Sequence, residues 1–285
     1  MIQTIVSFGR MIKFSHTVFA LPFALSAVIL AGQNIQLKAW DIFWIVIAMI
    51  GARSSAMGFN RVIDASFDAK NPRTSNREIP SGKISKNHSI IFVCCFSALF
   101  VLSSLMLGNV CFAFSIPVLF ILFFYSFTKR FTQFSHIYLG FAISLAPLGA
   151  WIAATKQFDW PILFLSLALL THISGFDILY ACQDQEFDAS EGLFSIPSTY
   201  GIHKALNISR LLHVLSFACF IAIFYLFTMG YIYLFATAII GILLFIEHQM
   251  VNVNNLSRIP IAFFHMNSSV SLVLLAGIAA DTLLS

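Results

Sequence analysis

Long uncharged apolar stretches recur along this chain, and they leave few folds open to it other than a bundle of membrane-spanning helices. Residues 87–128 include no Lys, Arg, Asp or Glu, and one crossing needs only about 20 apolar residues. We therefore expect a turn at 108–109 and, in the uncharged stretch 211–246, another near Gly230. Only 10% of the residues are charged, against about 25% in soluble domains. The sequence predicts an all-α polytopic membrane protein.

The crossings can be placed from the apolar runs. We expect nine transmembrane helices, at 14–35, 40–59, 90–107, 110–128, 137–154, 160–180, 205–227, 231–250 and 262–282. No soluble domain is predicted between them. The expected arrangement is a single transmembrane domain over 1–285, with two related helical halves around a central cavity in a lipid bilayer.

Basic residues mark one side of this topology, since short loops rich in Lys and Arg stay cytoplasmic. The opposite loops contain only Lys38 and Lys156, so we predict a cytoplasmic N-terminus and an external C-terminus. The formal charge of +4 is explained by this topology, and neither a nucleic-acid partner nor an obligatory protein partner is predicted. The cytoplasmic basic residues are Arg10, Lys13, Arg61, Lys70, Arg73, Arg77, Lys83, Lys86, Lys129, Arg130, Lys204, Arg210 and Arg258.

Two polar clusters end long apolar segments, and each has its members four residues apart. On a continuous helix that spacing places oxygen ligands on one face. Carboxylates at membrane helix ends need a positive partner, and hard cations such as magnesium suit them. The clusters are Asn60, Asp64 and Asp68 in GFNRVIDASFD, and Tyr180, Asp184 and Asp188 in DILYACQDQEFD.

A weak internal repeat places the two clusters at corresponding positions. The first is followed by Ile-Pro-Ser-Gly at 79–82, and the second by Ile-Pro-Ser at 196–198 with Gly201 after it. Turn chemistry alone could produce such a repeat, but it does not require acidic clusters at the same places. We expect two related halves whose long loops meet on the cytoplasmic side.

The residues around the clusters indicate a phosphate-bearing ligand. Arg73 and Arg77 follow the first cluster, and Arg binds phosphate through paired hydrogen bonds while magnesium bridges phosphate to carboxylate. Asp177 precedes the second cluster, whereas Glu186 should point away from it into solvent. Two such sets across a cavity could hold two or more magnesium ions on one diphosphate. The alternative for the first cluster is a solvated helix end with mixed charges.

Three further residues are candidates for substrate binding. Arg53 lies seven residues before Asn60, on the same predicted helical face and about two turns deeper. A buried Arg needs a partner, either a ligand anion or a group of the protein. Tyr125 and Lys129 stand one turn apart at a predicted cytoplasmic helix end, although the positive-inside rule alone would account for Lys129.

Together these motifs resemble the UbiA family of intramembrane aromatic prenyltransferases across the whole chain. The first family motif is approximated by residues 60–68, its Arg-Thr-x-Asn-Arg-x-x-Pro-Ser-Gly sequel by 73–82, its central Tyr-x-x-x-Lys by 125–129 and its second acidic motif by 180–188. The chain departs from the family at Arg61, where many members have Asp, and at residues 13–16, where several carry an Arg-rich pair.

The resemblance implies an enzyme of an inner membrane that transfers a polyprenyl group from a polyprenyl diphosphate to an aromatic acid. Magnesium would be held by Asn60, Asp64, Asp68, Asp184 and Asp188, and substrates by Arg53, Asn60, Arg73, Arg77, Tyr125, Lys129 and Tyr180. A Phe-rich cavity would shield the allylic cation from water. The expected acceptor is a 4-hydroxybenzoate, in quinone biosynthesis.

Two alternatives remain open from the residues. Segments 13–22 and 175–181 resemble the branch that makes menaquinone through futalosine, whose acceptor is a dihydroxynaphthoate. Intramembrane charges and repeats also occur in secondary transporters. The acidic residues here gather at predicted cytoplasmic helix ends rather than at mid-membrane, which favours the enzyme.

Overall fold

The long apolar segments are helical. The structure, a computed structural model, describes residues 2–251, 256 and 258–284. Within these residues nine helices are long and apolar enough to cross a membrane. Helices satisfy their own backbone hydrogen bonds, as a bilayer requires of a crossing segment. The all-α prediction is confirmed, and the protein is a multi-pass membrane protein.

The chain forms two compact units, Met1–Thr17 with Phe43–Thr128, and Val18–Ile42 with Lys129–Ser285. The first contains α1 (Ile2–Met11), most of α3 (Ala39–Ile63), α4 (Ala65–Lys70), α5 (Lys86–Leu107) and α6 (Asn109–Thr128). The second contains α2 (Leu21–Gly32), α7 (Ser135–Thr155), α8 (Ile162–Ala181), α9 (Gln185–Ser190), α10 (Ile196–Tyr200), α11 (Ile202–Leu226), α12 (Tyr231–Met250), α13 (Ile259–Ile261) and α14 (Asn267–Leu284).

The expected turns occur where sequence composition placed them. Helix α5 ends at Leu107, and Gly108 has φ +118°, a backbone conformation that only Gly adopts freely, before α6 begins. Gly230 separates α11 from α12. The predicted crossing 14–35 corresponds to the span Ser15–Gly32. It is not one regular α-helix, because a 3₁₀ segment (Phe14–Phe19) precedes α2, where Pro22 occupies the first turn. Proline lacks an amide hydrogen, and in the first turn no intrahelical hydrogen bond is lost by its absence.

In the first unit, α3 is held close to α5 and to the N-terminal segment. A side-chain carbon at Gly51 would lie 2.9 Å from the backbone nitrogen of Phe100 on α5, so only a small residue permits this approach. Met11, Ile12 and Ile84 form a small apolar cluster with neighbours that include Met57 of α3. This packing fastens α1 and the loop after α4 beside the same helix.

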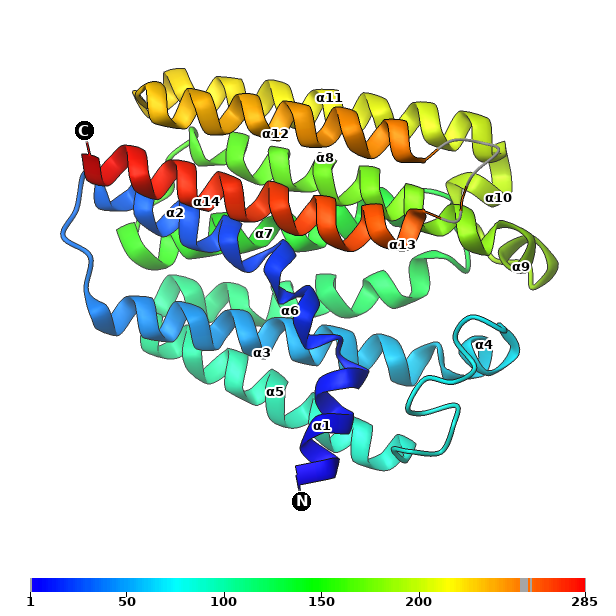
Figure 1. The fold of residues 1–285 in the computed structure, drawn as a ribbon. Coiled ribbons are helices and arrows are strands. Elements are labelled where there is room, and N and C mark those ends of the chain that lie inside the picture. Colours follow the sequence, from blue (N-terminus) through cyan, green and yellow to red (C-terminus); the bar gives the residue numbers. More distant parts are fainter. Residues whose placement is uncertain (1, 252–255, 257, 285) are drawn as a thin grey trace. The chain divides into compact units, whose positions relative to one another are not determined.

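In the second unit, α8 is the central helix, and it packs against both α7 and α11 (Figure 1). Two serines of α11 donate hydrogen bonds to backbone carbonyls of α8: Ser209 Oγ to Gly175 at 2.8 Å and Ser216 Oγ to Ala168 at 2.9 Å. Small residues and interhelical hydrogen bonds are the usual means of helix association in lipid. They give α8 a defined position, and α8 leads directly into the second acidic cluster.

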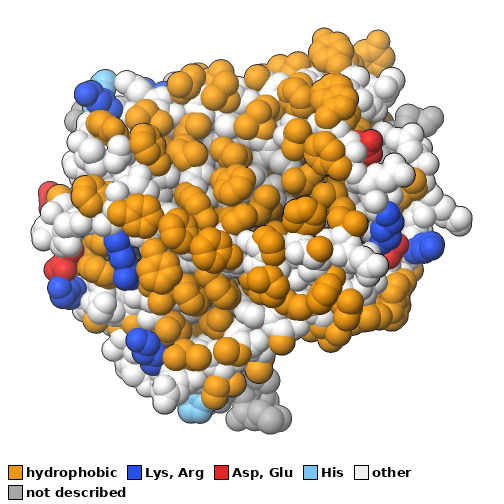
Figure 2. Space-filling view, turned by 180° about the vertical axis from the view of Figure 1, so that it is seen from behind, with side chains coloured by type: hydrophobic (Ala, Val, Ile, Leu, Met, Phe, Trp, Pro, Cys, Tyr) orange, Lys and Arg blue, Asp and Glu red, His pale blue; other side chains and the backbone are white. Residues whose placement is uncertain are grey.

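The outer surface is suited to lipid. Figure 2 shows hydrophobic side chains over much of the visible face, with charged side chains mainly toward its left and right sides. Large exposed apolar residues include Phe120 of α6, Val214 of α11 and Phe235 of α12. On a soluble protein so much exposed apolar surface would be an aggregation hazard, whereas here hydrocarbon chains can cover it.

The contact between α7 and α8 supplies a stability prediction. A side-chain carbon at Gly140 would meet the Leu170 carbonyl and the Ser174 hydroxyl, whereas one at Gly149 on the same helix meets nothing within 4 Å. Gly140→Ala should lower stability by about 1–3 kcal/mol because the backbone must shift. Gly149→Ala should be neutral or slightly stabilising, since Gly is a weak helix former. Thermal unfolding of both variants in detergent checks this, and equal behaviour would contradict the packing assignment.

Candidate functional site

Each acidic cluster spans a break between two helices. Asp64 follows α3 with φ −91° and ψ 3°, and Asp184 precedes α9 with φ −107° and ψ 9°. This sparsely populated backbone region recurs at active sites. The shared face expected for a continuous helix is therefore interrupted in each cluster. Asp64 and Asp184 stand at the N-cap positions of new short helices without a capping hydrogen bond from their side chains, and in the second cluster a 3₁₀ turn, Cys182–Asp184, precedes the short helix.

The two breaks are followed by the same local structure. Helices α4 and α9 each contain six residues, and each carries its second aspartate, Asp68 or Asp188, at the fourth position. Both aspartates are buried, at 7% and 2% exposure, whereas Glu186 is exposed. The predicted internal repeat thus corresponds to a repeated helix, break and short helix. The prediction that Glu186 is a solvated residue is confirmed.

The first cluster is organised by hydrogen bonds within its own unit. Asn60 Nδ2 donates to Asp64 Oδ2 at 2.7 Å, and Arg77 Nη1 to Asp68 Oδ1 at 2.6 Å. Thr74 donates to the Asp68 backbone carbonyl at 3.1 Å, which ties the Arg-rich loop to α4. The other carboxylate oxygen of Asp68 is buried and has no hydrogen-bond partner among the described residues. A buried, unsatisfied carboxylate oxygen is suited to binding a cation.

Arg53 and Arg61 of α3 bind the protein itself. Arg53 donates to the Lys13 carbonyl at 2.9 Å and to Thr17 Oγ1 at 3.0 Å, and Arg61 Nε donates to the Met11 carbonyl at 3.1 Å. These carbonyls lie at and just beyond the end of α1, where intrahelical partners run out. The two arginines therefore fasten the N-terminal segment beside the first cluster. The predicted role of Arg53 toward a substrate stays a prediction.

The second cluster has a lysine partner in its own unit. Lys129 Nζ lies 3.3 Å from Asp188 Oδ2, and the Lys129 carbonyl accepts a hydrogen bond from the Phe194 amide at 2.7 Å. Burial acts to lower the pKa of Lys129, but Asp188, Asp177 and Asp184 outweigh it, so the pKa is raised. Lys129 is therefore a permanent cation next to Asp188, as Arg77 is next to Asp68.

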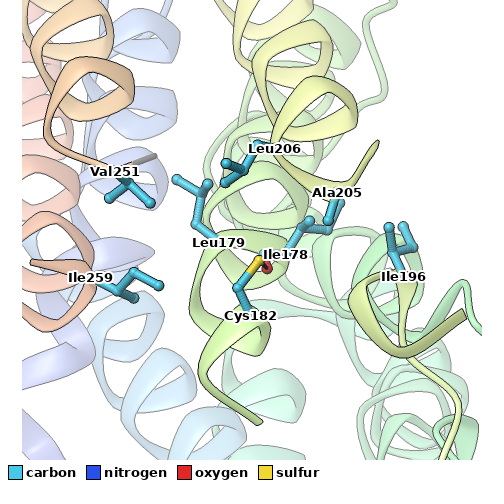
Figure 3. Close-up of a cluster of buried hydrophobic side chains, with 8 residues drawn as sticks. All are labelled: Ile178, Leu179, Cys182, Ile196, Ala205, Leu206, Val251 and Ile259. Carbon is cyan, nitrogen blue, oxygen red and sulfur yellow. Dashed lines mark hydrogen bonds between the residues drawn. The ribbon is translucent and has the colours of Figure 1, made fainter. Parts of the chain in front are cut away.

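An apolar cluster holds the helix end that bears this second site. Figure 3 shows Ile178, Leu179 and Cys182 from the end of α8 beside Ile196 of α10 and Ala205, Leu206, Val251 and Ile259. All eight side chains are buried. Tyr180 packs against the same cluster and is partly buried. This buried apolar cluster thus fixes the position of the helix end that precedes the break at Asp184.

A buried histidine, which the sequence reasoning did not identify, extends the second site. His136 of α7 is fully buried, and its Nδ1 lies 2.6 Å from Asp177 Oδ2 on α8. Asp177 itself remains 20% exposed. The two residues stand 41 positions apart in sequence, so no motif spacing could have linked them.

Comparison with known proteins now adds to this geometry. The sequence profile described as the UbiA prenyltransferase family matches residues 20–269. This chain belongs to the UbiA prenyltransferase family. Membership makes it a prenyltransferase, and it decides between the enzyme and transporter alternatives.

Relatives of this UbiA family member agree in length and fold. A 4-hydroxybenzoate octaprenyltransferase of Vibrio campbellii is 25% identical over 253 residues, covering 88% of each chain. The structure of a UbiA homolog from Aeropyrum pernix K1 is 29% identical with a TM-score of 0.85, covering 93% of this chain and 98% of that one. A UbiA homolog from Archaeoglobus fulgidus, bound to DMAPP and Mg²⁺, shares the fold at 18% identity and a TM-score of 0.71.

The donor set of this UbiA protein fits magnesium shared with a phosphate ligand. Among the residues that the structure describes, no three His, Cys, Asp or Glu are grouped to hold a metal ion by themselves. Magnesium characteristically takes one or two carboxylates and completes its shell with water and substrate phosphates. Asp68, with one oxygen on Arg77 and the other buried without a hydrogen-bond partner, offers such a ligand.

The remaining predicted site residues have less defined surroundings. Arg73 is exposed in the loop after α4, with its backbone amide donating to Asn71 Oδ1 at 2.9 Å. Tyr125 lies on the last turn of α6 and is partly buried. Their roles in this UbiA protein stay predictions, as does that of Tyr180.

Lys13 provides a pH prediction. Burial, and then Arg61, Arg77 and Arg73, lower the pKa of Lys13 to about 8, against 10.5 for an ordinary lysine. Between these two pH values the unfolded chain binds more protons than the folded one, so stability should rise with pH. Lys13→Arg, always charged, should remove the rise, and so should the neutral Lys13→Met. The melting temperature of the wild type should approach that of the Met variant as pH increases.

That experiment has a simple contrary outcome. If the differences in melting temperature between the wild type and the Lys13→Arg and Lys13→Met variants stay constant from pH 7 to pH 10.5, the lowered pKa of Lys13 is wrong. The comparison is made in detergent without magnesium or diphosphate, because a bound anion would favour the charged lysine.

Proposed function

We propose that this protein transfers a polyprenyl group from a polyprenyl diphosphate to an aromatic acid of the 4-hydroxybenzoate type, in quinone biosynthesis. The observation that carries the proposal is the repeated break, short helix and buried aspartate, each with its own cation: Asp68 with Arg77, and Asp188 with Lys129. Paired carboxylates and cations suit a magnesium diphosphate. The relatives named as 4-hydroxybenzoate octaprenyltransferases support this acceptor class.

In the proposed site both clusters take part in binding the diphosphate. Asp64, Asp68, Asp184 and Asp188 would hold magnesium, with Asn60 orienting Asp64 through its 2.7 Å hydrogen bond and serving as a further ligand. Bound magnesium supplies neutralisation of the charge that develops on the leaving diphosphate. Arg77 lies next to Asp68 and Lys129 next to Asp188. When the diphosphate binds, both would also donate hydrogen bonds to its phosphate oxygens.

The other proposed residues serve the substrates. Arg73 would add a guanidinium to the diphosphate, and Tyr125 and Tyr180 would donate phenolic hydrogen bonds, as the family resemblance implies. Arg53 keeps the N-terminal segment in place, and we retain it as a residue that supports substrate binding. Phenyl side chains along the apolar helices would exclude water while the allylic carbon is positively charged.

We propose an inner, cytoplasmic membrane as the location, with the N-terminus and the site loops facing the cytoplasm and the C-terminus outside. The basic loops support this orientation. Labelling of single cysteines placed at Lys83 and at Lys156 with a membrane-impermeant reagent tests it. Only the position at Lys156 should react in intact cells, and labelling at Lys83 instead would reverse the topology.

The function is tested with purified protein in detergent, magnesium and a panel of donors and acceptors. We expect 4-hydroxybenzoate to be prenylated, with activity abolished by EDTA and restored by magnesium. A dihydroxynaphthoate is the second acceptor, because segments 13–22 and 175–181 resemble the menaquinone branch. Prenyl diphosphates of several chain lengths identify the donor. No product with any combination, for protein that remains folded, would reject the proposed function.

A further inference from the structure

We propose that His136 is a positioning residue that orients the Asp177 carboxylate, and that Asp177 accepts a hydrogen bond from the hydroxyl of the aromatic acceptor. The inference rests on the proposed function, since it assigns an acceptor contact within the same site. Neither residue belongs to the acidic motifs at 60–68 and 184–188. The argument starts from the protonation of the His136 ring.

The backbone decides which nitrogen of His136 carries the proton. The amide of Ile196 points at His136 Nε2 across 3.4 Å, and an amide can only donate. Nε2 is therefore the acceptor, and in the neutral ring the proton sits on Nδ1. Nδ1 then donates to Asp177 Oδ2 at 2.6 Å. His136 therefore links the backbone amide of Ile196 to one carboxylate oxygen of Asp177 through its two ring nitrogens.

Rigid elements hold both ends of this relay. Ile196 begins α10, whose start is fixed by a capping box between Ser195 and Ser198. His136 lies on the first turn of α7 and is fully buried, while Gly140, one turn later, keeps α7 close against α8. A buried ring clamped between three helices leaves its hydrogen-bond partner little rotational freedom.

The position of Asp177 favours the acceptor over the diphosphate. Asp177 precedes Asp184 by seven residues on the span Ile162–Ser190, which is about two helical turns, or 10 Å, farther from the helix end. The diphosphate is expected at that end, so the allylic carbon and the attacking ring lie on the apolar side of it. The side chain of Asp177 is 20% exposed while the side chain of Asp188 is 3% exposed, so part of the Asp177 side chain is accessible to a ligand.

Paired ligands and paired variants test the inference directly. Binding of 4-hydroxybenzoate and of 4-methoxybenzoate is measured by calorimetry without donor or metal, because only the first can donate its hydroxyl proton. We expect the wild type to bind 4-hydroxybenzoate about 10-fold or more tightly, as for one hydrogen bond to a charged group. Asp177→Asn and His136→Leu should lose most of that preference.

Two near-isosteric variants separate positioning from mere packing. Asn at 136 places its amide NH₂ near the position of Nδ1, whereas Gln places it near Nε2. We expect His136→Asn to keep the acceptor KM within about threefold of wild type and His136→Gln to raise it about 10-fold or more. The KM for the prenyl diphosphate and the magnesium affinity should stay within about twofold in both variants.

Several results would overturn the inference. Equal binding of the hydroxy and methoxy compounds by the wild type, or an unchanged preference in Asp177→Asn, rejects the acceptor contact. Loss of magnesium or diphosphate affinity in step with acceptor affinity makes Asp177 part of the metal site instead. If Leu at 136 prevents folding, the Asn and Gln pair decides. Failure of the wild type to prenylate any acceptor rejects the proposed function, whereas normal wild-type turnover with unaffected variants rejects only this inference.

Discussion

Replacing Asp64 and Asp184 together by Asn should abolish prenyl transfer, lowering kcat by at least about 10³-fold. Each residue stands at a break between a membrane helix and a short helix. Asn preserves the shape of the side chain, but it removes the negative charge that would hold magnesium. Each single variant should lose less than the double variant. Product formation from labelled prenyl diphosphate measures all three.

A matched control lies within the second cluster. Glu186→Gln removes the same charge from the same short helix, but Glu186 is exposed, so activity should stay within about twofold of wild type. Magnesium affinity, measured by calorimetry with a nonreactive diphosphate analogue, should fall in the double variant and not in the control. Retained activity in the double variant, or wild-type activity indifferent to EDTA, would sink the metal assignment.

Replacing Lys129 by Met should change magnesium and diphosphate binding in opposite directions. Lys129 lies 3.3 Å from Asp188, and its pKa is raised because the surrounding aspartates outweigh the effect of burial. It therefore competes with a metal ion for that carboxylate while attracting phosphate. The variant should bind magnesium alone more tightly. Its kcat/KM for the prenyl diphosphate should fall by about 10²-fold, as when one electrostatic contact to a developing charge is lost.

The neighbouring basic residue supplies the control. Arg130→Met removes a charge from an exposed side chain one position along the chain, and it should alter neither quantity by more than about twofold. Lys129→Arg keeps the charge but presents a planar fork, so it should retain more activity than Met. If magnesium and diphosphate affinity fall together in Lys129→Met, Lys129 supports the structure of the site rather than binding phosphate.

The repeat shows how far sequence reasoning reached. The spacing of Asp64 and Asp68, and of Asp184 and Asp188, matches two equivalent short helices in the structure, and Glu186 is exposed as expected. The shared face was expected on the condition of a continuous helix, and the structure has a break at each cluster. A four-residue spacing is compatible with a continuous helix and with an interrupted one, since at Asp64 the backbone hydrogen bonds from Asp64 to Asn60 and from Asp68 to Asp64 are both present. Periodicity cannot distinguish them.

The arginines of α3 illustrate a second limit. A buried Arg53 was expected to have either a ligand or a protein partner, and the structure provides carbonyls beyond the end of α1. Arg61, which looked like a lost metal ligand, binds the Met11 carbonyl in the same way. Helix α1 was not predicted from the sequence, so motifs alone could not identify the carbonyls at its end as the partners of these arginines.

The sequence by itself determined that this is a multi-pass all-α membrane protein of the UbiA family, because length, hydropathy and motif spacing are local properties. Only the tertiary structure decided the break at Asp64 and Asp184, the pairing of Lys129 with Asp188 and the contact between His136 and Asp177. These contacts join residues 41 or 59 positions apart. The physical reason is that helix packing brings such residues together, and packing depends on complementary surfaces that no single segment contains.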